Sequence, residues 1–127
     1  MKNKLMIITN NPLVVKEMSE ENYVIYKETS YEGILYEIRD LVHKGFRLLT
    51  HPLSGSVKPK ETPYKSVMMM EGEALDKDSL ALIEKAIEAC GKFEDKTGRY
   101  TKDTLEDFKL IDLDLVKGAR ASCVYIN

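Results

Sequence analysis

Residues 50–66, THPLSGSVKPKETPYKS, connect two apolar runs and have no helical pattern of their own. The segment holds three of the four prolines and one of the two histidines of the chain. A connection of about 15 residues is longer than most connections in a compact domain, and long ordered loops are usually functional. We therefore expect a functional site at residues 51–65, which we call the 51–65 loop.

Four short apolar runs are predicted strands: residues 5–8, 23–26, 46–50 and 67–70. The run at 5–8, LMII, is continuous rather than alternating, which indicates a strand that is buried on both faces of its sheet. Helical periodicity fills the two intervals between the first three strands, and a long helix is predicted to follow the fourth strand and to end near Asp95.

Local signals mark where two of these helices begin and end. Asn11 is a good N-cap, and Pro12 suits the first helical position because proline has no N–H to leave unpaired there. Thr29 and Glu32 match a capping box for the second helix. Gly45 is predicted to end that helix in the left-handed conformation.

The C-terminal third of the chain has two interpretations. Leu105, Phe108, Ile111 and Leu115 keep helical spacing, whereas residues 111–115 alternate like a strand. We interpret residues 109–116 as helix, with a break near Asp112 left open. A carboxylate pair formed by Asp112 and Asp114 would share a face only in the strand, so both are expected on a solvated face.

The order of elements predicts a single α/β domain over residues 1–127. Strands that alternate with helices favour a three-layer sandwich, with a mostly parallel, Rossmann-like sheet of about four strands flanked by helices. The direction of the fourth strand stays open. The 51–65 loop is long enough for a parallel crossover, and it could equally form a wide hairpin that returns antiparallel along an edge.

Composition excludes several classes of protein. Apolar residues make up 43% and charged residues 31% of the chain, as is typical of a soluble globular domain. The net charge is −2 with no basic face, so nucleic acid is not an expected partner. Neither a membrane span nor a signal peptide is predicted, which favours the cytoplasm. Two distant cysteines without metal-ligand or C-x-x-C spacing predict no disulfide, and we expect neither a metal nor a cofactor.

The predicted ligand site lies at the carboxyl ends of the strands, where open parallel sheets bind their ligands. Small hydroxyls, a glycine and a lysine in the 51–65 loop have the chemistry of an anion cradle, although the spacing of a P-loop is absent. A polar surface loop pinned by prolines is the alternative. The candidate ligand-binding residues are Asn10, Asn11, Ser54, Gly55, Ser56, Lys58, Tyr64 and Lys65.

His51 is the candidate catalytic residue. Its imidazole could act as a general acid or base, or it could hydrogen-bond the loop to the scaffold. Tyr64 and Lys65 would lie at the same site only if the fourth strand begins near His51, which requires the antiparallel direction.

Four segments carry a resemblance to a known family: TNNPL at 9–13, LTHPLSGSVKP at 49–59, ETPYKS at 61–66 and LEDFKLIDLDL at 105–115. The chain resembles the GrdX family, small proteins encoded beside the glycine, sarcosine and betaine reductase genes of anaerobic bacteria. The resemblance covers nearly the whole chain. It implies a cytoplasmic protein linked to reductive amino-acid fermentation, and it brings neither an established activity nor catalytic residues.

Three hypotheses follow. The favoured one is an accessory or regulatory protein that binds a component of the glycine reductase machinery through the 51–65 loop. The second is a small-molecule site, and perhaps an enzyme with His51 as acid–base, for an anionic or phosphorylated metabolite at the carboxyl edge of the sheet. The third is a homodimer in which an edge strand pairs with a second copy.

Overall fold

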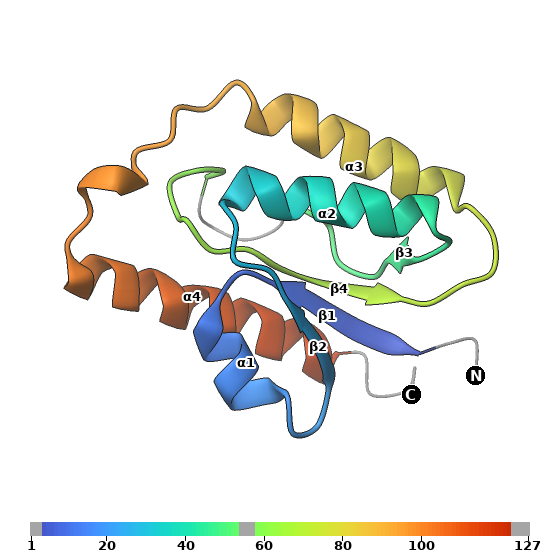
Figure 1. Ribbon diagram of the computed structural model, residues 1–127, viewed down its shortest axis with the longest axis horizontal. Helices are drawn as coiled ribbons and strands as arrows, with labels where there is room; N and C mark the ends of the chain where they lie inside the picture. Colours follow the sequence, from blue (N-terminus) through green and yellow to red (C-terminus); the bar gives the residue numbers. More distant parts are fainter. Residues whose placement is uncertain (1–3, 54–57, 123–127) are drawn as a thin grey trace.

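The computed structural model describes residues 4–53 and 58–122, which form a four-stranded sheet between two layers of helices (Figure 1). The strands lie in the order β2-β1-β4-β3. The elements along the chain are β1 (Leu5–Thr9), α1 (Pro12–Met18), β2 (Tyr23–Tyr26), α2 (Tyr31–His43), β3 (Arg47–Leu48), β4 (Ser66–Met70), α3 (Lys77–Cys90), the short 3₁₀ helix η1 (Thr97–Arg99) and α4 (Lys102–Ala121).

The sheet is mixed, so the expected mostly parallel, Rossmann-like sheet is wrong. Among the described strands, only β1 and β2 pair in parallel, whereas β4 is antiparallel to both β1 and β3. The described residues of the 51–65 loop include no helix, and β4 enters between β1 and β3 instead of lying along an edge. Its run of buried residues, SVMMM, suits this central position.

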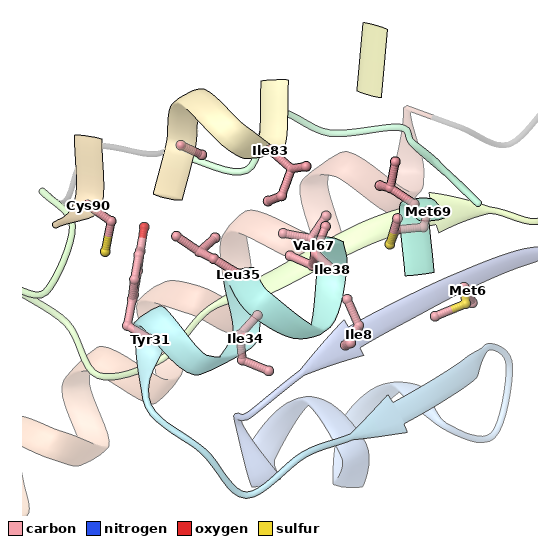
Figure 2. Close-up of a cluster of buried hydrophobic side chains, with 12 residues drawn as sticks. Met6, Ile8, Tyr31, Ile34, Leu35, Ile38, Val67, Met69, Ile83 and Cys90 are labelled. Atoms are coloured by element: carbon pink, nitrogen blue, oxygen red, sulfur yellow. The ribbon is translucent and has the colours of Figure 1, made fainter. Parts of the chain in front are cut away.

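The two faces of the sheet have separate cores. Helices α2 and α3 cover one face, where Leu35 and Ile38 of α2 pack among side chains of the sheet and Ile83 of α3 (Figure 2). Helices α1 and α4 cover the opposite face, over Ile7 and Met68. Successive residues of β1 and β4 therefore point into different cores, as expected for strands buried on both sides.

The predicted signals at Asn11, Pro12 and Gly45 are confirmed, and the one at Thr29 is wrong. Asn11 caps α1 by accepting a hydrogen bond from the Leu13 N–H, and Pro12 is the first helical residue. Gly45 adopts a φ of 105° after α2. The capping box of Thr29 is wrong by one residue, because the hydroxyl oxygen of Ser30 accepts from the Gly33 N–H at 3.0 Å.

Helix α4 is continuous through Asp112, so neither the break nor the strand occurs. The expected apolar stripe is out of phase, since Ile111 and Leu115 are exposed and the buried residues are Asp112, Leu113 and Val116. Asp112 was expected on a solvated face, and this expectation is wrong. In the part of the chain that the structure describes, no helix combines the length and apolarity needed to cross a membrane.

Candidate functional site

The antiparallel direction of β4 brings the end of the 51–65 loop to the carboxyl end of β1. Thr9, the last residue of β1, pairs with Ser66, the first residue of β4. Asn10 follows Thr9 and bonds to three backbone groups. Its Nδ2 donates to the carbonyls of Thr29 and Pro63, both at 2.8 Å, and its Oδ1 accepts from the Lys65 N–H at 2.8 Å. One amide thus joins β1, the start of α2 and the loop.

A cavity of about 300 Å³ lies at this junction. Asn10 and Tyr26 line it from the ends of β1 and β2, and Ser30 and Tyr31 line it from the start of α2. The other lining residues come from the loop, from the chain at the start of η1 and from α4: Lys60, Thr62, Pro63, Tyr64, Asp95, Thr97 and Lys109. The cavity is therefore built from five separate segments at the carboxyl edge of the parallel strand pair.

Two lysines bring positive charge to the cavity walls. Lys60 Nζ lies 3.3 Å from Glu32 Oε1, and its side chain is only 15% exposed. Lys109 Nζ donates to Glu106 Oε2 at 2.9 Å and lies 5.8 Å from the centroid of the Tyr64 ring. The bond to Glu106 is the main cause that raises the pKa of Lys109, so this ammonium stays charged at neutral pH.

A buried polar network lies behind the cavity and joins α4 to the sheet. The Ser66 hydroxyl donates to Asp112 Oδ2 at 2.6 Å and lies 2.6 Å from the hydroxyl of Thr9. Asn11 Nδ2 donates to the same Asp112 oxygen and to the Lys109 carbonyl, both at 3.0 Å. Asn11 therefore caps α1 and also holds the middle of α4.

Burial shifts the two charged groups of this region in opposite directions. Burial raises the pKa of Asp112, although the hydrogen bonds from Ser66 and Asn11 and the charge of Lys65 oppose the rise. Burial lowers the pKa of Lys65, while the charge of Asp112 acts to raise it. Lys65 Nζ also lies 5.9 Å from the centroid of the Tyr31 ring. Each group is thus an ionisable side chain held inside the protein by polar and aromatic neighbours.

Comparison with known proteins identifies the family. A family model described as GrdX-like protein matches residues 6–120. The chain belongs to the GrdX-like protein family. No curated protein and no solved structure matches the chain. The match runs from β1 to α4, so it includes the cavity, the buried network and the 51–65 loop of this GrdX-like chain.

The structure brings part of the predicted ligand site of the GrdX-like chain together. Asn10 and Tyr64 line the cavity, and Asn11 and Lys65 belong to the buried region behind it. Lys58 is exposed and is not part of the cavity wall. Ser54, Gly55 and Ser56 lie outside the described residues, so the predicted cradle stays a prediction.

His51 is exposed and lies outside the cavity wall. Its Nδ1 accepts a hydrogen bond from the Leu53 N–H at 3.1 Å, which is the geometry of a side chain that holds its own loop. In residues 4–53 and 58–122 no carboxylate pairs with the imidazole. The acid–base role of His51 stays a prediction.

The candidate ligand-binding residues predicted from the sequence do not include Glu28, Lys60 and Lys109, and Asp112 was expected on a solvated face. Glu28, Lys60 and Lys109 come from three segments and have no motif spacing, so only the fold brings them to one cavity. Asp112 carried a usable signal, because Leu113 and Val116 give a second helical phase that places Asp112 beside the core.

Proposed function

We propose that this protein is a cytoplasmic accessory protein of the glycine, sarcosine or betaine reductase system, and that it binds a component of that machinery through the 51–65 loop. The observation that carries the proposal is membership of the GrdX-like family over residues 6–120. The loop is the long connection between β3 and β4, and its two ends are hydrogen-bonded to the rest of the domain.

The anchoring of the loop supports a role in protein binding. At its start, Thr50 Oγ1 accepts from the Met68 N–H at 3.2 Å. At its other end, the Tyr100 hydroxyl donates to the Glu61 carbonyl at 2.6 Å. Between these anchors, His51 and Lys58 are exposed. Each of these side chains lies near an anchored end of the loop, where a fixed backbone loses less conformational entropy when a partner binds, so both suit a preformed contact.

An anaerobic pull-down tests this proposal. The bait is the purified protein, and the lysate comes from a glycine-fermenting bacterium. The test variant combines His51→Ala with Lys58→Ala. The matched control combines His43→Ala with Lys44→Ala, because these residues are also an exposed histidine and lysine but lie at the far end of α2.

We expect the wild type and the control to retain a reductase subunit and the loop variant to lose it, with equal melting temperatures for all three proteins. Retention of the same subunit by the loop variant would remove the loop from the contact. Failure of the wild type to retain any reductase subunit would refute the accessory role.

The second candidate function is small-molecule binding, and the cavity of about 300 Å³ is the observation that favours it. Its volume is at the lower end of the range for ligand sites, which suits a small metabolite. Lys60 and Lys109 supply positive charge for an anionic group of that metabolite. Ligand-dependent stabilisation tests this function, because a ligand that binds only the native state raises the free energy of unfolding.

A further inference from the structure

We propose that the cavity binds a small zwitterion that carries one carboxylate and one ammonium group, the chemistry of a free α-amino acid. This inference rests on the second candidate function and names the ligand class of the same site. It is carried by the charges and rings that line the cavity, which include both signs of charge and three tyrosines.

The carboxylate of such a ligand would bind the two lysines. Lys60 and Lys109 line the cavity from the loop and from α4. The backbone of Lys60 adopts a φ of 66°, the one left-handed non-glycine residue in the described chain. A lysine in this conformation carries a steric cost that glycine would not. Strain of this kind often occurs where a side chain must be held at a functional site.

The ammonium group would bind the acidic part of the wall. Glu28 lines the cavity and has neither a hydrogen-bond nor an ion-pair partner within the described chain. Asp95 also lines the cavity, and its Oδ1 accepts from the N–H and the hydroxyl of Thr97. These bonds keep the pKa of Asp95 below its ordinary value, so its carboxylate is charged at neutral pH.

Aromatic rings add a second set of groups that attract a cation. Tyr26, Tyr31 and Tyr64 all line the cavity. The protein already places its own lysines over two of these rings, with Lys109 over Tyr64 and Lys65 over Tyr31. The rings of this site therefore act as acceptors for ammonium groups, and Tyr26 has no such lysine in the described residues.

The balance of charge favours a zwitterion over an anion. Two lysines and two carboxylates line the cavity, and each lysine also forms an ion pair with a glutamate outside it, Lys60 with Glu32 and Lys109 with Glu106. The six side chains together are more acidic than basic. A phosphate ester would meet this net negative charge, whereas a zwitterion places its carboxylate on the lysines and its ammonium on Glu28.

Calorimetric titration of the purified protein with matched probes tests the inference. Glycine and L-alanine are the zwitterions, acetate and methylammonium are the two halves of glycine, and inorganic phosphate is the anion. We expect the zwitterions to bind, and to raise the melting temperature at about 10 mM. Acetate, methylammonium and phosphate should each bind at least about tenfold more weakly than glycine, because each pairs with cavity groups of only one sign of charge.

Two substitutions connect binding to the proposed residues. Glu28→Gln and Lys109→Gln should each weaken glycine binding by about tenfold or more, since each removes one charge-assisted hydrogen bond. The controls are Glu17→Gln, an exposed glutamate of α1, and Lys117→Gln, an exposed lysine two turns further along α4. Both controls should bind glycine like the wild type.

The possible outcomes separate this inference from the accessory role. No heat and no thermal shift with either zwitterion would overturn the inference, and so would acetate or phosphate that binds as tightly as glycine. Equal loss of affinity in the two controls would also contradict it. The accessory role fails on different data, namely the loss of reductase retention in the pull-down with the wild-type protein.

Discussion

Ser66 donates a 2.6 Å hydrogen bond to Asp112 Oδ2, and this bond joins the first residue of β4 to the middle of α4. Both residues are buried. Thr9 and Asn11 complete the same network from the end of β1. This buried polar network therefore links the sheet, the end of the 51–65 loop and the last helix.

Removal of the Asp112 carboxylate should break this buried network and destabilise the protein. Asp112→Ala leaves the Ser66 hydroxyl and the Asn11 amide without their shared buried acceptor, and we expect a loss of about 2–4 kcal/mol in the free energy of unfolding. Urea unfolding measures the loss. Asp114→Ala is the control, since Asp114 is exposed on the same helix and should change stability by less than about 0.5 kcal/mol. Equal effects for the two variants would contradict the buried network.

Asp112 should also give the protein an unusual dependence on pH. Burial raises its pKa above the ordinary value of about 3.9, so between these two values the native state holds a proton that the unfolded chain releases. Stability from this group is therefore present at low pH and is lost as pH rises through the raised pKa. The stability of the wild type relative to Asp112→Asn should grow as the buffer is acidified from neutral pH. A constant or shrinking difference in urea unfolding would show that Asp112 is not shifted in this direction.

Loss of the Asn10 side chain should destabilise the junction at which the cavity lies. Asn10→Ala removes three hydrogen bonds and leaves two carbonyls and one N–H of the junction without their partner. We expect a loss of about 2–4 kcal/mol, which thermal and urea unfolding would measure. Asn22→Ala is the comparison, because Asn22 makes one bond through each end of its amide but is only partly buried. A smaller loss for Asn10→Ala than for Asn22→Ala would refute this assignment.

Replacement of Lys60 by glycine should leave the protein more stable than replacement by alanine. At a φ of 66°, alanine keeps the steric cost of the left-handed conformation and glycine does not. Lys60→Gly should therefore be more stable than Lys60→Ala by about 1 kcal/mol. Both variants lose the contact with Glu32, so their comparison isolates the backbone. Equal stability in urea would mean that the position carries no strain.

The sequence predicts the elements of this fold well but not the direction of β4. Residues 5–8 and 67–70 are continuous apolar runs, and both are central strands buried on two faces. Such a run is the same in either direction, because no alternation or short turn fixes its register. A mixed sheet and a parallel sheet therefore predict the same pattern, and the loop of residues 51–65 is long enough for both.

The site was only partly predictable, because some of its residues come together only through the packing of distant elements. Asn10 and Tyr64 were candidates because they follow or precede strands at the expected edge, and both line the cavity. Lys109 is nearly 100 residues from Asn10 along the chain, and only the packing of α4 places it there. Asp112 was expected on a solvated face because it and Asp114 would share a face only in a strand, whereas the helix buries Asp112 together with Leu113 and Val116. Burial of a charged residue depends on partners that sequence spacing alone does not identify.

Photo-crosslinking from the loop is the most direct test of the accessory role. The purified protein would carry His51→benzoylphenylalanine or, as the matched control, His43→benzoylphenylalanine, and would be irradiated in an anaerobic lysate of a glycine-fermenting bacterium. The account predicts a crosslinked product that contains a glycine, sarcosine or betaine reductase subunit from position 51 and none from position 43. Crosslinks to that subunit from both positions, or from neither, would contradict binding through the 51–65 loop.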